Sequence, residues 1–278
     1  MPVRLLITLL ALSALIPLGL AVANDDAAVA LYAVPGALLF AVAFVFRPEL
    51  EWAYYRRYPS DLGAPVVKLL ETKLPGYYAR LSEGERLALR QRTELTASGL
   101  DFKPQTQEAT TLPADFAALL AIQLARLTVG LSPKHTIPQP FEIVVVYRHP
   151  FPSRQFPEHV HNSELYEEDG VVLLSLHQAL PAAMDPSEYF NIALYEWVRA
   201  CGIAWGVPEV EDLPDYATAL DAVLGREPYW VRDAIGLPDE AIDDTAVLQV
   251  LRLDFPEAFA ETYPALHDRL AVALRPAV

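Results

Sequence analysis

The amino-acid sequence predicts an α+β protein in which a two-helix membrane hairpin precedes one folded domain. Two uncharged runs near the N-terminus, residues 5–23 and 27–46, each approach the ~20 residues that a helix needs to cross a hydrocarbon core. Beyond them, one-faced helical patterns alternate with two short β-branched runs, a mixture typical of an α+β domain. We therefore expect a hairpin with a juxtamembrane collar in residues 1–60 and a separate domain in residues 61–278.

The charges that flank the two uncharged runs predict how the hairpin lies in a membrane. Arg4 precedes the first run, the acidic residues 24–26 separate the two, and Arg47 and residues 56–57 follow the second. Positive residues stay on the cytoplasmic side. We therefore expect both ends of the hairpin and the main domain on the cytoplasmic side of the inner, or cytoplasmic, membrane. Residues 49–59, which are aromatic and basic, are expected to form a collar among the lipid headgroups.

Two other interpretations of the N-terminus remain open. Residues 21–23 (Ala-Val-Ala) end the first run in the manner of a signal-peptide cleavage site. In that case the second run still returns the chain to the cytoplasm. Alternatively, both runs are buried core helices of a soluble domain, although two adjacent runs of this length are rare in cores.

Composition excludes some classes of function. The formal net charge of −15 argues against nucleic acid as the main partner, because binding to phosphates needs clustered Lys and Arg. The single cysteine, Cys201, forms no internal disulfide, so no oxidising compartment is required. Cys201 itself is expected to be a small buried apolar residue.

The domain begins with recognisable helix signals. Ser82 and Glu85 have the spacing of a capping box, so a helix should start there, continue to about residue 97 and end at Gly99. The β-branched runs at 142–147 and 171–176 predict strands separated by a long loop. Further helices are expected at about residues 115–129, 187–202, 214–224, 241–254 and 263–274.

Several short motifs occur in an order that resembles a known family. They are Leu74-Pro75-Gly76-Tyr77, Leu81-Ser82, Glu85-Arg86, the strand ending in Val146-Tyr147, the strand 171–176, and Asn191 just before a helix. Over about residues 74–270 the chain resembles the Mlc titration factor family, a group of gluzincin-type zinc peptidases. The resemblance implies a zincin-like fold, similar to that of the catalytic domain of the lethal-factor toxin.

The resemblance also locates the positions of the family's metal site. The family carries His-Glu-x-x-His on one helix, and the matching residues here are Tyr195, Glu196 and Arg199. Its third ligand is a Glu six residues before a Pro-Glu-x-Phe-Ala turn, which matches Val250 ahead of residues 256–260. Glu196 is the retained general base, whereas the three vestigial metal positions hold residues that do not replace the ligands.

The substitutions predict that zinc and peptidase chemistry are lost. Without a metal-bound water, Glu196 has no nucleophile to activate. We hypothesise that Arg199, three residues after Glu196 on the helix, pairs with it and supplies the positive charge of the missing metal. The alternative is that Arg199 extends into solvent and Glu196 is an ordinary surface carboxylate.

The sequence therefore predicts a membrane-anchored pseudopeptidase that binds a protein without catalysis. The resemblance implies a regulatory partner, since namesake members of the family titrate a transcriptional repressor. A first alternative is an active zinc metallopeptidase with non-standard ligands, for which the loop residues His159 and His161 are the candidates. A second is an accessory subunit of a membrane complex, recognised through its hairpin.

Overall fold

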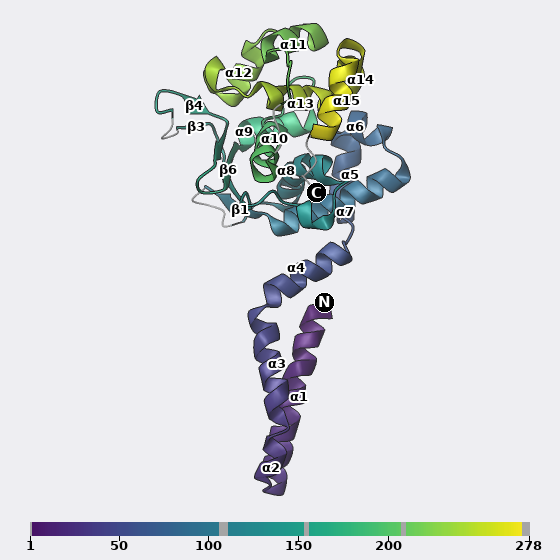
Figure 1. The fold of residues 1–278 in the computed structure, drawn as a ribbon, viewed down its shortest axis with the longest axis vertical. Helices are drawn as coiled ribbons and strands as arrows, with labels where there is room; N and C mark the ends of the chain where they lie inside the picture. Colours follow the sequence, from purple (N-terminus) through teal and green to yellow (C-terminus); the bar gives the residue numbers. More distant parts are fainter. Residues whose placement is uncertain (1, 106–110, 153–155, 207–209, 274–278) are drawn as a thin grey trace. The chain divides into compact units, whose positions relative to one another are not determined.

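The chain folds into two compact units, Met1–Pro59 and Ser60–Val278. The computed structural model describes residues 2–105, 111–152, 156–206 and 210–273. Each unit has secondary structure of its own, entirely helical in the first and mixed in the second (Figure 1). The fold class is therefore α+β, as the sequence predicts.

The first unit is a helical hairpin. Helices α1 (Pro2–Asn24) and α3 (Ala33–Val45) pack against each other, and the short helix α2 (Ala27–Ala30) joins them. The carboxylate of Asp26 caps α2 by accepting a hydrogen bond from the backbone N–H of Ala28, at 2.9 Å. A β-carbon placed on Gly36 would lie 2.6 Å from Ser13 Oγ and 2.9 Å from the backbone nitrogen of Ala14. The two helices therefore meet at Gly36, where only glycine allows so close an approach.

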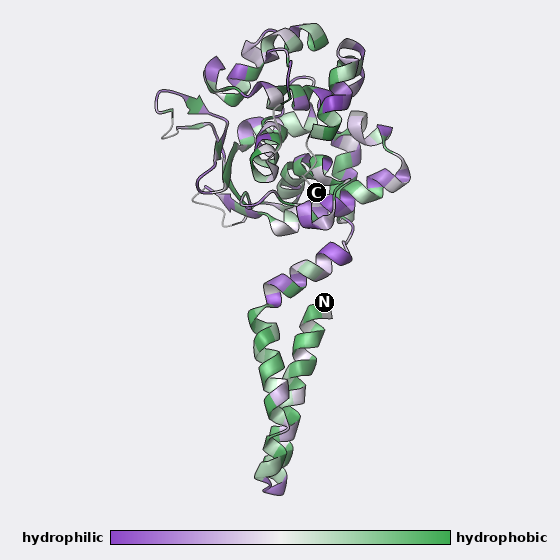
Figure 2. Ribbon diagram, in the orientation of Figure 1, coloured by the Kyte–Doolittle hydropathy of each residue, from purple (hydrophilic) through white to green (hydrophobic). Residues whose placement is uncertain are grey.

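Helices α1 and α3 consist mostly of apolar residues, as their hydropathy colouring shows (Figure 2). Many of their large apolar side chains are exposed. Residues 5–24 and 27–45 are long and apolar enough to cross a membrane, and only 11% and 17% of their most apolar windows are buried. Core helices of a soluble domain would be mostly buried. The low burial favours the interpretation of these helices as membrane spans.

The expected collar is helical. Helix α4 (Arg47–Arg57) follows the hairpin, and Arg47 pairs with Glu51 on it at 3.0 Å. The guanidinium of Arg56 lies 5.8 Å from the ring centroid of Trp52. Aromatic and basic side chains therefore share this helix, a composition typical of the headgroup region.

The second unit contains a four-stranded mixed sheet with the strand order β1-β2-β6-β5. Strands β1, β2 and β6 are parallel, and β5 runs antiparallel to β6 at the edge. A separate two-stranded ribbon pairs β3 with β4. The strands are β1 (Asp101–Pro104), β2 (Ile143–Tyr147), β3 (Phe151–Pro152), β4 (Val160–His161), β5 (Ser163–Tyr166) and β6 (Val171–Ser175).

The helices of this unit pack against one another, and α9 and α10 also contact the sheet. Helix α10 packs on β5 and β6, and α8, α9 and α13 pack against α10. The core lies where these elements meet, because α8, α10 and α13 are buried on most sides. The helices are α5 (Ala64–Lys73), α6 (Pro75–Arg80), α7 (Glu83–Gly99), α8 (Ala114–Thr128), α9 (Leu176–Met184), α10 (Ile192–Trp205), α11 (Tyr216–Leu224), α12 (Tyr229–Ile235), α13 (Asp244–Asp254), α14 (Pro256–Thr262) and α15 (Pro264–Ala273).

Several expectations from sequence are confirmed by this arrangement. The capping box at the start of α7 is complete, with Ser82 Oγ accepting from the backbone N–H of Glu85 and the Glu85 carboxylate accepting from that of Ser82. The strands expected at 142–147 and 171–176 are β2 and β6. Cys201 is fully buried.

Two expectations were wrong. Residues 148–170 were expected to be a loop, yet they contain β3, β4 and the edge strand β5. Ser163 and Glu164 have low strand propensity, and β5 forms because its partner β6 is a strong strand beside it. The helix expected from residue 187 begins only at Ile192, because Asn191 is its N-cap and the residues before it form a loop.

Candidate functional site

Helix α10 carries Tyr195, Glu196 and Arg199, the residues that the family resemblance matches to the His-Glu-x-x-His motif. It begins where the side chain of Asn191 accepts a hydrogen bond from the backbone N–H of Leu194, at 3.1 Å. It ends at Gly206, whose φ of 58° is the left-handed conformation that suits a glycine after a helix. Apolar residues on most of its sides bury the helix between the sheet, α8 and α13. Residues on its inner faces are thereby removed from water.

Glu196 is the most unusual residue of this helix, because its carboxylate is fully buried. Its Oε2 accepts a hydrogen bond from Arg199 Nη1 at 2.8 Å, and the exposed fractions of the two side chains are 0% and 20%. The pairing that we hypothesised from sequence is therefore confirmed. The alternative, a surface carboxylate beside a solvated arginine, was wrong.

The electrostatics of the pair are set by burial. Burial raises the pKa of Glu196 and is the largest influence on it, and the charge of Arg199 opposes this shift. Burial alone would lower the pKa of Arg199, and the surrounding negative charges, with Glu196 first, raise it overall. The two groups therefore stabilise each other in a medium where either alone would be costly.

Strand β5 supplies two further polar groups near Glu196. The Ser163 hydroxyl lowers the pKa of Glu196 and the charge of Glu164 raises it. Both side chains are buried. The Ser163 hydroxyl does not reach hydrogen-bond geometry, and neither its Oγ nor Glu196 Oε1 has a hydrogen bond within the described part of the chain. The Arg199 contact is therefore the main interaction that compensates the Glu196 charge.

Tyr195 connects α10 to α13. Its hydroxyl accepts a hydrogen bond from the backbone N–H of Asp243, the N-cap of α13, at 2.9 Å. Burial, more than any other influence, raises the pKa of this phenol, so it is neutral. The guanidinium of Arg199 lies 5.6 Å from the Tyr195 ring centroid. Arg199 therefore contacts both Tyr195 and Glu196.

Val250 is buried on α13, which packs against α10. The three positions that the resemblance matches to metal ligands therefore belong to two neighbouring helices. A neutral phenol, a guanidinium and an isopropyl group offer no lone pair suited to zinc, so these residues do not fit the metal. Nowhere in residues 2–105, 111–152, 156–206 and 210–273 do three or more His, Cys, Asp or Glu side chains form a group that could hold a metal ion.

The two loop histidines have different surroundings. His161 is fully buried on β4, and its Nε2 lies 3.3 Å from the carbonyl oxygen of Phe156. His159 is exposed and lines a cavity beside α12 together with Arg232 and Asp233. The structure does not bring the two imidazoles together with a third ligand among the described residues.

Sequence reasoning did not place Ser163 and Glu164 near Glu196, because it treated their segment as a loop. One signal was present, since Asp169-Gly170 precedes the strand at 171 and Asp-Gly is a common hairpin turn. Gly170 is the last of the four residues that join β5 to β6, and its φ of 62° is a left-handed conformation that suits glycine. A strand on the other side of this turn was therefore predictable, although its contact with Glu196 was not.

In comparisons with known proteins, no family model, curated protein or solved structure matches the chain.

Proposed function

We propose that this protein is a membrane-anchored pseudopeptidase of the Mlc titration factor type, whose zincin-like domain binds another protein without catalysis. The observation that carries the proposal is the buried ion pair between Glu196 and Arg199. A general base must reach a water molecule or substrate proton. Glu196 has no exposed surface, and its one hydrogen-bonding oxygen is occupied by Arg199.

The packing of α10 on α13 supports the zincin-like part of the proposal. The resemblance requires that the helix with Tyr195 and Arg199 lie beside the helix with Val250, because all three positions share one metal in the family. These helices do pack against each other, although about forty residues separate them in sequence. In this proposal, Arg199 supplies positive charge in place of the family's dication.

The hairpin supports the membrane part of the proposal. Two apolar helices with little buried surface need a lipid or protein environment. Arginines 47, 56 and 57 follow the second helix, whereas Asp25 and Asp26 lie between the two. By the positive-inside rule, the larger unit faces the cytoplasm, at the cytoplasmic membrane. The expected partner is a cytoplasmic regulator or a neighbouring membrane subunit, and not nucleic acid.

The first test is the zinc content of the full chain, purified in mild detergent without chelator and measured by elemental mass spectrometry. We expect far less than one zinc per chain. A triple variant, Tyr195→His, Arg199→His and Val250→Glu, should bind about one zinc if these positions correspond to the family's ligands. The double variant that keeps Val250 is the matched control and should bind zinc more weakly.

Each outcome bears on a different part of the proposal. One zinc per wild-type chain would refute the pseudopeptidase. A well-folded triple variant that binds no more zinc than wild type would refute the zincin-like alignment. Folding of each variant is checked by circular dichroism and by the fluorescence of the buried Trp197.

A second test concerns the partner. Replacing residues 1–59 with an unrelated two-span hairpin should leave co-purification of a cytoplasmic regulator unchanged. Loss of the partner on this replacement would favour the accessory-subunit alternative, in which the hairpin makes the contact.

A further inference from the structure

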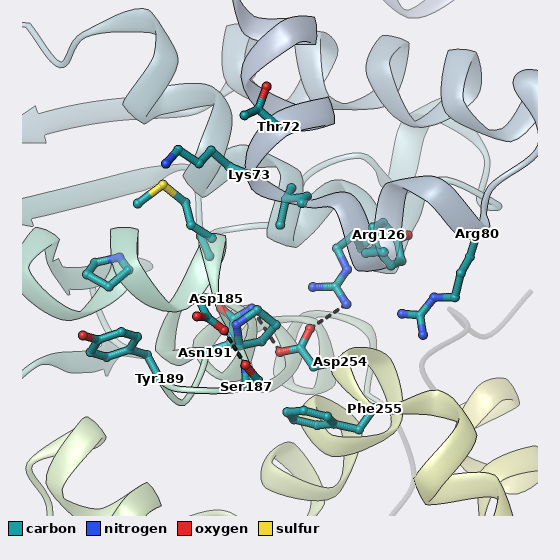
Figure 3. A pocket seen from close by; sticks show the side chains of 16 residues that line it. Thr72, Lys73, Arg80, Arg126, Asp185, Ser187, Tyr189, Asn191, Asp254 and Phe255 are labelled. Atoms are coloured by element: carbon teal, nitrogen blue, oxygen red, sulfur yellow. Dashed lines mark hydrogen bonds and ion pairs between the residues drawn. The ribbon is translucent and has the colours of Figure 1, made fainter.

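The largest described cavity, of about 690 Å³, lies in the second unit between the α5–α6 segment and the loop that joins α9 to α10 (Figure 3). Its arginines already have partners. Arg126 is 4% exposed and pairs with Asp254 at 2.7 Å, and Arg80 pairs with Glu257 at 2.7 Å. The arginines of this cavity are therefore compensated within the protein, whereas those at the end of helix α4 in the first unit are not.

Helix α4 ends in two arginines without an acidic partner. Neither Arg56 nor Arg57 forms an ion pair with a residue that the structure describes. Aromatic rings contact both side chains, since the guanidinium of Arg56 lies 5.8 Å from the ring centroid of Trp52 and that of Arg57 lies 5.9 Å from that of Tyr58. A guanidinium stacked on a ring keeps N–H groups free to donate. The two arginines are therefore available to an external acceptor.

The acids of the first unit do not neutralise this end of α4. Glu51 pairs with Arg47 at 3.0 Å, and Glu49 lies in the first turn of the helix. At 1.5 Å per residue, the two arginines lie roughly 8 Å beyond Glu51 along the helix axis. Asp25 and Asp26 belong to the connection between the two candidate spans. The end of α4 is therefore locally positive, in a chain whose net charge is −15.

Helix α4 lies at the end of both candidate spans. It begins at Arg47, directly after α3 ends at Val45, and it contacts α1 as well as α3. Figure 1 shows α4 at an angle to α3, beside the N-terminal end of α1. The apolar part of α1 starts at Leu5, close to that end. In a bilayer that the two helices span, α4 would therefore lie among the phospholipid headgroups.

We propose that Arg56 and Arg57 bind the phosphate groups of anionic phospholipids, so that the hairpin prefers a negatively charged leaflet. The N–H donors of a guanidinium match two phosphate oxygens. Zwitterionic phospholipids carry a cationic group beside the same phosphate, which repels the arginines, whereas anionic ones do not. The inference rests on the membrane anchor of the proposed function and names the class of lipid that the anchor recognises.

Native mass spectrometry of the full chain tests the class of lipid. The protein is purified in a mild non-ionic detergent and mixed with equal amounts of phosphatidylglycerol and phosphatidylcholine that have the same acyl chains. An arginine near an anionic surface favours binding by roughly fivefold, so we expect at least about fivefold more phosphatidylglycerol adducts. Added salt should reduce this preference. Inorganic phosphate at the same ionic strength should not reduce it further.

Two double variants assign the preference to α4. Arg56→Gln with Arg57→Gln should bring the ratio of the two lipid adducts close to one. Arg148→Gln with Arg232→Gln removes the same charge from exposed positions of the second unit and should leave the ratio unchanged. The proposal would be overturned by equal ratios in wild type and the α4 variant, by a wild-type chain without preference, or by displacement of the lipid by inorganic phosphate.

Failure of the membrane anchor would give a different result. Liposomes of phosphatidylcholine alone should retain wild type and both double variants after an alkaline wash, because the apolar spans, and not the arginines, hold the hairpin in the bilayer. Release of all three chains would refute the anchor, and the lipid preference with it. Retention of all three chains without a lipid preference would refute only the preference.

Discussion

Removing Arg199 should destabilise the protein strongly, because Glu196 would be left buried without its cation. The two side chains are 20% and 0% exposed, and their atoms lie 2.8 Å apart. Breaking a pair this well buried costs about 3–5 kcal/mol. For a domain of this size, a loss of that magnitude lowers the melting temperature by roughly 6–20 °C. We therefore expect a loss of this order for Arg199→Met.

The cost should depend on pH in a defined direction. Burial raises the pKa of Glu196 above its ordinary value of 4.5, and Arg199 opposes that shift. In the variant the opposing charge is absent, so the pKa of Glu196 rises further. A carboxyl with a raised pKa in the folded state contributes stability at low pH and loses it as pH rises through that pKa. The difference between wild type and variant should grow from about pH 4 toward neutral pH, by up to about 1.4 kcal/mol per pH unit.

The assay is urea unfolding of the full chain in detergent, followed by tryptophan fluorescence at several pH values. Arg232→Met is the matched control, because the Arg232–Asp239 pair is 3.5 Å apart and both side chains are about half exposed. It should cost less than about 1 kcal/mol. The double variant Glu196→Gln and Arg199→Met should recover much of the stability, since it leaves no buried charge. Equal, small losses for Arg199→Met and Arg232→Met would refute the reasoning.

Two further predictions concern contacts between helices. Gly36→Leu should force α1 and α3 apart, because even a β-carbon at this position would lie 2.6 Å from a side-chain oxygen of α1. Gly19→Leu is the control, since its side chain would enter open space and should not separate the helices. Distances between spin labels on the two helices measure the separation, and equal distances in both variants would contradict the prediction. Tyr195→Phe should cost about 1–2 kcal/mol, because the backbone N–H of Asp243 loses its acceptor. Urea unfolding measures that loss against Tyr229→Phe, which changes an exposed ring and should be nearly neutral.

The features that sequence predicted well are those encoded within a few neighbouring residues. Two uncharged runs dictate helices that are apolar on every side, and the structure has them. Ser82 and Glu85 fix the start of α7 because both hydrogen bonds of the capping box lie within one turn. The spacing of Glu196 and Arg199 placed them on one face of a helix, which made their pairing a reasonable hypothesis.

Features that depend on contacts between distant segments were decided by the tertiary structure. The 3-residue spacing did not determine that Glu196 is fully buried, because burial comes from β5, β6, α8 and α13 packing around α10. Strand β5 exists because β6 offers it a paired edge, despite its own weak propensity. The cavity likewise combines Lys73, Arg126 and Asp254, which are far apart in the chain. Hydrogen bonds within one helical turn and the spacing of apolar residues follow directly from the sequence. The burial of Glu196 and the compensation of its charge depend on which segments the folded chain brings together.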